Sequence, residues 1–257
     1  MKVITDVREL PSACAFVPTM GALHAGHGSL FIIANSYSEN VVASIFVNPL
    51  QFENAEDLEK YPRTPEQDIE IAEQYGVTHL WLPTFDDIYP DGYAKLSAGP
   101  IGSLYEGASR PGHFDGVVTV VRRLFDLVKP KVAIFGEKDF QQLALIREIA
   151  NEVEIIAAPI VRESDGLAMS SRNVRLSPEG RIASAIISRA LSQSQSEEEL
   201  RQILATEKEF TLDYADYIDE KSFKAPTASS QFTRAIVAGW INGVRLLDNM
   251  AVKRAGE

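Results

Sequence analysis

The first 160 residues alternate short apolar segments with longer segments of helical periodicity, and this alternation constrains the fold more than any other feature of the chain. The apolar segments are rich in β-branched residues and short enough to be buried strands of a parallel sheet. We expect strands at 13–17, 41–47, 79–82, 132–135 and 154–160, with helices at 28–36, 65–75, 117–128 and 139–150. Strands that alternate with helices predict a doubly wound α/β domain with a parallel sheet and right-handed crossovers.

The pattern changes after residue 160. Helices are expected at 177–190 and 197–206, followed by short strands at 214–218, 234–241 and 245–248. Asn242-Gly243, between the last two strands, is typical of a two-residue type I′ hairpin turn. We therefore expect two domains, the doubly wound domain at 1–160 and a smaller α+β domain with an antiparallel sheet at 161–257.

The composition is that of a globular protein with an acidic balance. The chain has 25 Lys and Arg against 36 Asp and Glu, a formal net charge of −11, and 45% of its 257 residues are hydrophobic. Because proteins that bind long nucleic acids usually carry a basic face, this acidity argues against a nucleic-acid partner. No apolar run approaches the roughly 20 residues that span a membrane, and no apolar signal-peptide core opens the chain. We expect a cytoplasmic protein with no membrane partner, and a buried Cys14 that forms no internal disulfide.

Residues 18–27, Pro-Thr-Met-Gly-Ala-Leu-His-Ala-Gly-His, join the first expected strand to the first expected helix. The unpaired N–H groups and the dipole at a helix N-terminus favour phosphate, and glycines let the backbone approach a ligand closely. His24 and His27 add two imidazole donors that lack the permanent charge of Arg. This connection therefore predicts a phosphate-binding turn.

The other unusual polar clusters also follow expected strands. Asn48 and Gln51 come after the second strand, Lys138 after the fourth, and residues 162–173 after the fifth. In open α/β sheets ligands bind beyond the carboxyl ends of the strands, so these clusters are expected to form one site. Lys138 supplies a mobile point charge suited to phosphate, and Asp139 is expected to cap the helix that follows.

Further side chains extend this candidate site. The hydroxyls and guanidinium of Met169-Ser170-Ser171-Arg172-Asn173 are suited to a triphosphate, and Asp165-Gly166 before them indicates a turn in a mobile loop. The neutral amides of Gln51 and Gln142 suit hydroxyl and carboxylate groups, and Arg110, in a loop rich in Gly and Pro, could meet a carboxylate or phosphate. No spacing of His and Cys residues indicates a dedicated metal site.

These motifs resemble those of known enzymes. His24-Ala25-Gly26-His27 resembles the His-Ile-Gly-His motif of adenylate-forming Rossmann-like enzymes, and Met169-Ser170-Ser171-Arg172 resembles their Lys-Met-Ser-Lys-Ser loop. The chain as a whole resembles the pantothenate synthetase family, the pantoate–β-alanine ligases, through segments 17–21, 44–52, 61–64, 112–114, 135–142, 165–173 and 234–240. It departs from the family at 192–234, which is shorter and more divergent, and at Leu50, where Met is frequent.

The resemblance implies a two-step reaction. The pantoate carboxylate attacks the α-phosphate of Mg-ATP to give pantoyl adenylate and pyrophosphate, and the β-alanine amine then displaces AMP. The requirement for ATP and Mg²⁺, with the metal bound through ATP, and a homodimeric assembly are implied in the same way. The larger domain would bind ATP and pantoate, and the smaller domain would carry the Met-Ser-Ser-Arg loop.

The resemblance also assigns residues to roles. His24, His27, Lys138 and Arg172 are the implied catalytic residues, which with the helix N-terminus and Mg²⁺ would supply positive charge where two anions meet. Gln51, Gln142, Asn48 and Arg110 are implied to bind pantoate or β-alanine. The residues implied to bind ATP are Met20, Gly21, Ala22, Leu23, His24, Ala25, Gly26, His27, Gly136, Glu137, Lys138, Asp139, Val161, Met169, Ser170, Ser171 and Arg172.

Other functions share some of these features. A nucleotidylyltransferase that acts on another small acid or on a phosphorylated acceptor would use both ATP motifs. A phosphorylated acceptor would need a further cationic pocket, and the neutral side chains of Gln51 and Gln142 argue against one. A tRNA synthetase would need an RNA-binding module, for which this acidic chain leaves little room. A nucleotide-binding regulator would need neither Lys138 nor the Ser-Ser-Arg loop.

Overall fold

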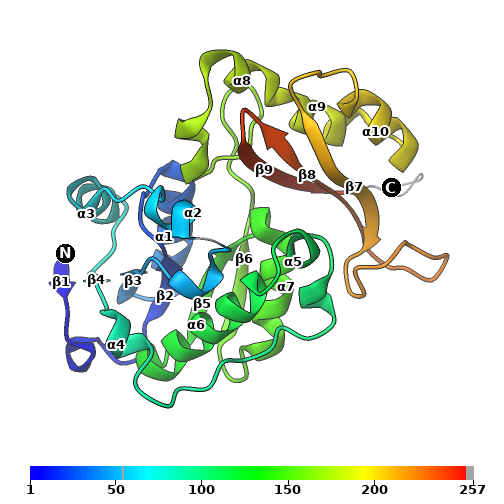
Figure 1. Cartoon of the computed structure of the whole chain (residues 1–257). Coiled ribbons are helices and arrows are strands. Elements are labelled where there is room, and N and C mark those ends of the chain that lie inside the picture. The colour runs from blue at the N-terminus through cyan, green and yellow to red at the C-terminus, as the bar shows by residue number, and fades with distance from the viewer. Residues whose placement is uncertain (54, 253–257) are drawn as a thin grey trace. The chain divides into compact units, whose positions relative to one another are not determined.

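The computed structural model describes residues 1–53 and 55–252, and the chain divides into two compact units, Met1–Pro159 and Ile160–Glu257. The elements of each unit are labelled in Figure 1. Among the described residues, no helix is both long and apolar enough to cross a membrane.

The first unit is built on a six-stranded parallel sheet with the strand order β1-β4-β3-β2-β5-β6. The five expected strands are all present, each within two residues of its expected bounds at either end. A sixth, β1, was not expected, because three residues are too few to show an alternating pattern. The strands are β1 (Lys2–Ile4), β2 (Ala15–Thr19), β3 (Val41–Ile45), β4 (His79–Trp81), β5 (Val132–Gly136) and β6 (Glu154–Ala158).

Helices cover both faces of this sheet, as a doubly wound fold requires (Figure 1). One core contains strand residues such as Ala15 and Val17 with α1 and α3, and the other contains Phe16 with α6 and α7. Neighbouring strand residues thus point to opposite faces, and both faces are apolar because both are covered. The helices are α1 (Ala25–Asn35), α3 (Pro65–Gln74), α6 (His113–Val128) and α7 (Phe140–Ile149), with the short α2 (Ala55–Glu59), α4 (Phe85–Ile88) and α5 (Glu106–Ser109) in the connections.

The strand order reverses between β2 and β5, which are neighbours in the sheet. From β2 the chain proceeds to β3 on one side, and from β5 it proceeds to β6 on the other. The register of β2 with β5 comprises only two residue pairs, at the amino ends of the two strands. Ligands of doubly wound sheets bind at such a reversal, so the carboxyl ends of β2 and β5 are the expected place for one.

The second unit carries an antiparallel sheet of β7 (Thr211–Asp219), β8 (Thr233–Ile241) and β9 (Val244–Ala251). The expected hairpin between β8 and β9 is confirmed, because Asn242 and Gly243 have φ angles of 50° and 74°. The helix expected at 177–190 is wrong as one element: α8 (Pro178–Ala183) ends and α9 (Ala185–Gln193) begins at the buried Ser184. The Ser184 hydroxyl donates to the Arg181 carbonyl in the last turn of α8. The last helix is α10 (Glu197–Leu204).

Candidate active site

The two histidines of the β2–α1 connection cap their own helix. Helix α1 begins at Ala25, three residues before the expected start, because His24 is its N-cap residue and His27 lies in its first turn. The Gly26 N–H donates to His24 Nδ1 at 3.1 Å, and the His24 N–H donates to His27 Nδ1 at 3.3 Å. This reciprocal arrangement is a capping box made of imidazoles, a role that His seldom takes.

The capping bonds fix the tautomer of both rings. A neutral imidazole that accepts at Nδ1 carries its proton on Nε2, and neither Nε2 has a partner among the described residues. Burial, with the nearby Lys138 charge, lowers the pKa of His24 to about 4. Burial, and then the adjacent His24, lower the pKa of His27 to about 3. The expectation that the histidines supply positive charge is therefore corrected: in the free protein at neutral pH they are neutral Nε2–H donors.

The backbone donors of the turn are mostly occupied, which also differs from the expected row of open amides. The Gly21 N–H donates to the Thr19 hydroxyl, and the Ala22 and Leu23 N–H groups donate to the Asp68 carboxylate. Of the backbone N–H groups from 21 to 27, only that of Ala25 lacks a partner among the described residues. The donors left for a ligand are this amide and the two imidazole Nε2–H groups.

Lys138 lies beyond β5, across the reversal of strand order from the histidines. It belongs to a 3₁₀ turn, Glu137–Asp139, that connects β5 to α7. Its charge adds to burial in lowering the pKa of both imidazoles. Asp139 occupies the N-cap position of α7, but its side chain makes no capping bond, so that expectation is wrong; its carboxylate lies 3.6 Å from Lys138 Nζ.

Asn48 and Gln51 form a buried amide pair at the end of β3. The Leu50 N–H donates to Asn48 Oδ1, and Asn48 Nδ2 donates to the Gly116 carbonyl at 3.1 Å, so the orientation of the Asn48 amide is fixed. Asn48 Nδ2 also donates to Gln51 Oε1 at 2.9 Å, and the Tyr89 hydroxyl donates to Asn48 Oδ1. The Gln51 NH₂ group is then left without a partner among the described residues.

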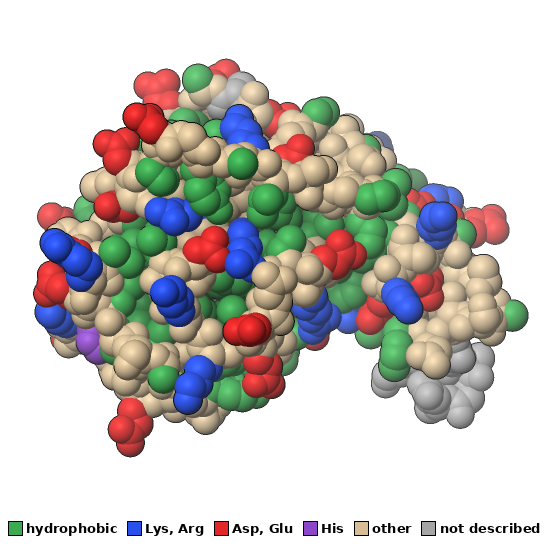
Figure 2. All heavy atoms as spheres, turned by 90° about the horizontal axis from the view of Figure 1, so that it is seen from below, with side chains coloured by type: hydrophobic (Ala, Val, Ile, Leu, Met, Phe, Trp, Pro, Cys, Tyr) green, Lys and Arg blue, Asp and Glu red, His purple; other side chains and the backbone are tan. Residues whose placement is uncertain are grey.

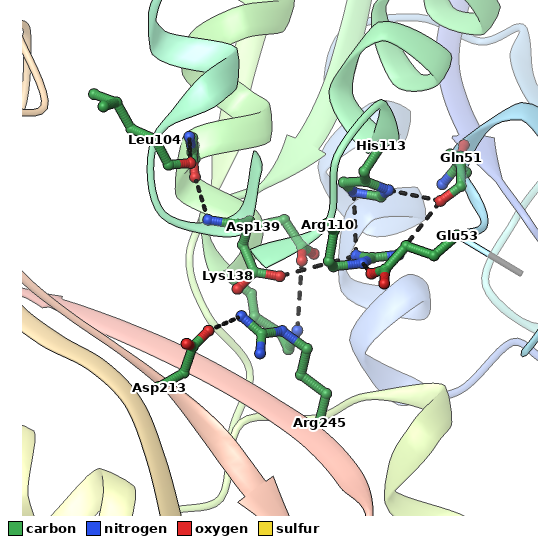
Figure 3. A network of polar contacts seen from close by, with 11 residues as sticks. Gln51, Glu53, Leu104, Arg110, His113, Lys138, Asp139, Asp213 and Arg245 are labelled. Atoms are coloured by element: carbon green, nitrogen blue, oxygen red, sulfur yellow. Dashed lines mark hydrogen bonds and ion pairs between the residues drawn. The ribbon is translucent and has the colours of Figure 1, made fainter. Parts of the chain in front are cut away.

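Arg110 and His113 hold the backbone of Gln51, as Figure 3 shows. His113 Nδ1 lies 2.8 Å from the Gln51 carbonyl oxygen. The Arg110 guanidinium is hydrogen-bonded to His113 Nε2. The Arg110 guanidinium also donates to the Glu53 carboxylate at 3.0 Å. Arg110 therefore already has a protein carboxylate as its partner, beside the backbone carbonyl of Gln51.

The consecutive glutamines of α7 have different surroundings. Gln141 is buried, and its NH₂ group donates to the Ile101 and Leu104 carbonyls while its oxygen accepts from the Glu106 N–H. Gln142 is half-buried and makes no side-chain hydrogen bond to any described residue. Gln141 is thus structural, and Gln142 is available to a ligand.

The remaining predicted residues lie in the second unit. Val161 accepts a hydrogen bond from the Met169 N–H at 2.9 Å, and residues 161–169 form a hairpin with the expected turn of Asp165-Gly166 at its tip. Ser170 then caps a 3₁₀ turn, Ser171–Arg175, by accepting from the Arg172 N–H. Within this unit Asp165, at the hairpin tip, pairs with Arg181.

The distribution of charge gives no sign of a nucleic-acid surface on the face drawn in Figure 2, where Lys and Arg side chains alternate with Asp and Glu. Among the described residues, no group of three or more His, Cys, Asp or Glu side chains is placed to hold a metal ion.

Comparison with known proteins decides the family. The family model described as pantoate-beta-alanine ligase matches residues 1–251. A pantothenate synthetase of Acidothermus cellulolyticus is 44% identical over 96% of this chain and 88% of its own length, and one from Xanthomonas euvesicatoria is 46% identical over 92% and 90%. The chain belongs to the pantoate–β-alanine ligase family.

Solved structures of this family have the same fold. A pantothenate synthetase of Thermus thermophilus is 41% identical, with a TM-score of 0.92 over 99% of this chain and all of its own. A pantoate–β-alanine ligase of Francisella tularensis, described as complexed with beta-gamma ATP and beta-alanine, is 35% identical, with a TM-score of 0.85 over the full length of both chains.

Proposed function

We propose that this chain catalyses the ATP-dependent condensation of pantoate with β-alanine through a pantoyl adenylate, releasing AMP and pyrophosphate. The observation that carries the proposal is the pair of neutral Nε2–H imidazoles at the N-terminus of α1, close to Lys138 at the reversal of strand order. Family membership supports the substrates.

In the first step the pantoate carboxylate attacks the α-phosphorus of ATP, and the bond from that phosphorus to the bridging oxygen of pyrophosphate breaks. A carboxylate is already a nucleophile at neutral pH, so no general base is needed, and catalysis consists of positioning and electrostatic stabilisation. His24 Nε2, His27 Nε2 and the Ala25 N–H donate to phosphate oxygens, and Lys138 offsets the charge that develops on the departing pyrophosphate.

Pantoate is oriented by the amide groups. Because Asn48 fixes the oxygen of Gln51, the Gln51 NH₂ group faces the substrate as a donor, and Gln142 adds a second neutral amide. Neutral donors can hold the hydroxyl and carboxylate groups of pantoate without forming an ion pair that would weaken the nucleophile. Asn48, Arg110 and His113 act in this scheme by holding Gln51.

In the second step the neutral amine of β-alanine attacks the acyl carbon of the adenylate, the bond to the AMP oxygen breaks, and the nitrogen releases a proton to water as the amide forms. Val161 and Met169–Arg172 are assigned to ATP on their sequence motif, with Ser170, Ser171 and Arg172 at the phosphates. Mg²⁺ enters as part of the substrate Mg-ATP. We further propose that the protein acts in the cytoplasm as a homodimer, and that the first unit binds ATP and pantoate.

Product analysis tests the proposal. With ATP, pantoate and β-alanine, the purified protein should form AMP, pyrophosphate and pantothenate in equal amounts. With pantoate alone it should exchange labelled pyrophosphate into ATP, because the first step is reversible before the amine arrives. ADP as the nucleotide product, or exchange that requires β-alanine, would refute the adenylate route.

A further inference from the structure

Asp68 is a buried carboxylate in the first turn of α3, and it is not among the residues predicted for the candidate site. Its side chain accepts three hydrogen bonds, and the residue is 2% exposed. Oδ2 accepts from the Ala22 N–H at 3.0 Å, and Oδ1 accepts from the Leu23 N–H at 2.7 Å and from the Thr64 hydroxyl at 3.0 Å. The two backbone bonds join α3 directly to the residues that precede the N-cap His24.

The turn that Asp68 holds has a backbone conformation that needs support. Gly21 and Ala22 have φ angles of 80° and 49°, and the left-handed region is unfavourable for Ala. Successive amides in turns of this kind converge into a concavity that binds anions. In this protein the anion is the Asp68 carboxylate.

The fit around the carboxylate is close. A Cβ atom on Gly21 would lie 2.8 Å from Asp68 Oδ2 and 3.0 Å from Ile45 Cγ2, so no larger residue fits there without a shift. Farther along the same two helices, a Cβ on Gly28 would lie 2.6 Å from the Tyr75 ring. Helix α3 therefore contacts α1 closely near the histidines, and it fixes the chain that leads into α1.

We propose that Asp68 is a positioning residue for adenylate formation: by holding the Ala22 and Leu23 amides it sets the orientation of His24 and His27 and closes these amides to phosphate. The expected effect on the rate of adenylate formation rests on the proposed function. The expected effect on the orientation of His24 and His27 rests on the hydrogen bonds alone. The phosphates are then held by the imidazole Nε2–H groups, the Ala25 N–H and Lys138, and not by the glycine turn.

Asp68→Asn is the direct test, because the amide keeps the size of the side chain but can accept from only one of the two backbone N–H groups. Its NH₂ group would face the other N–H, donor against donor. Glu70→Gln is the matched control, because it removes the same charge from an exposed position of the same helix. We expect Asp68→Asn to lower pantoate-dependent pyrophosphate exchange by about 10–100-fold, the scale of a misplacement by about 1 Å. The transfer of preformed pantoyl adenylate to β-alanine should stay within about twofold, since that step makes no use of the pyrophosphate contacts.

Histidine spectra test the structural part without any activity. The chain has only four histidines, so ¹⁵N-histidine labelling gives four assignable imidazoles. Asp68→Asn should shift the ring signals of His24 and His27 and leave those of His79 and His113 in place, and Glu70→Gln should leave all four. If the parent protein shows no exchange, the proposed function fails, while the spectra still decide the positioning role.

Three results would overturn the inference. These are exchange by Asp68→Asn that equals that of Glu70→Gln, equal loss of both reaction steps, and unchanged His24 and His27 signals. If Asp68→Asn does not fold, Thr64→Val removes one donor to the carboxylate and carries the same test. It should reduce exchange by about threefold or more and spare the transfer step, and a variant that matches Glu70→Gln in both steps would refute the proposal.

Discussion

Replacement of His27 separates the two tasks that the structure gives this residue. Its Nδ1 accepts the His24 N–H and so helps to cap α1, while its Nε2–H is left for a ligand. His27→Ala removes both. The lost capping bond is long, 3.3 Å, so its contribution lies at the low end for helix caps, about 0.5–1 kcal/mol of unfolding free energy. That corresponds to a fall of roughly 1–4 °C in Tm for a unit of this size.

The catalytic loss should be far larger than the loss of stability. Removal of one donor that acts on developing charge costs about 10²–10³-fold in rate, or about 3–4 kcal/mol of activation free energy. His27→Glu provides the matched variant, because Glu at this position of a capping box also accepts the N-cap N–H. We expect His27→Glu to recover the Tm that His27→Ala loses, and to remain inactive because a carboxylate would face the phosphates.

The assay is pyrophosphate exchange into ATP with pantoate alone, beside thermal unfolding of the same preparations. Exchange by His27→Ala at the parental rate would refute the role of His27 at the phosphates. The role would also be refuted if His27→Glu recovered both the Tm and the exchange rate that His27→Ala loses. Activity would then depend on the capped helix and not on the imidazole.

Three further predictions follow from the same geometry. Lys138→Ala should slow pyrophosphate exchange and leave the conversion of preformed pantoyl adenylate unchanged; equal loss in both assays would place Lys138 elsewhere in the reaction. Gln142→Ala should raise the KM for pantoate at constant Tm. Gln141→Ala should instead lower the unfolding free energy by about 1–3 kcal/mol, because the buried groups that it bonds lose their partners, and denaturant titration of both variants measures this difference. Acidification should destabilise the protein below about pH 6.5, since His24 and His27 have pKa values of about 4 and 3 in the folded state against 6.5 when unfolded, so the unfolded state binds more protons. Replacement of both histidines by Gln should flatten this dependence between pH 7 and pH 5, and an unchanged slope would contradict the burial of neutral imidazoles.

Local sequence patterns predicted the architecture well where the pattern has a direct physical cause. The five buried strands follow from apolar runs, and the β8–β9 hairpin follows from Asn242-Gly243, which accept positive φ angles. The start of α1 was misplaced because His is an unusual cap and the sequence does not show that His24 and His27 cap each other. The break at Ser184 has no sequence signal, because a serine such as Ser29 makes the same bond to a backbone carbonyl within the continuous helix α1.

The long-range contacts within the site could not be predicted in the same way. Asp68 is separated from Leu23 by 45 residues, and in the sequence it reads as an ordinary acid in the first turn of a helix. The contacts of Asn48 and Arg110 could not be predicted, because their partners, Tyr89, Gly116 and Glu53, come from segments with no recognisable motif. That the two residues bind the substrate stays a prediction. The residue types marked the site, while only the fold shows which of them have their polar atoms already occupied.

The neutral state of the two imidazoles suits a reaction in which anions must both bind and leave. A buried cation would lose hydration in the free protein and would hold pyrophosphate as tightly as it holds ATP. A neutral Nε2–H that is fixed by a backbone bond to Nδ1 needs no reorganisation when ATP arrives, and it releases pyrophosphate more readily than an imidazolium would. Lys138, in the turn after the neighbouring strand β5, would supply a point charge to the departing phosphate in the proposed mechanism. In the proposed reaction the fixed turn would set the geometry of attack, and Lys138 would offset the charge on the departing pyrophosphate.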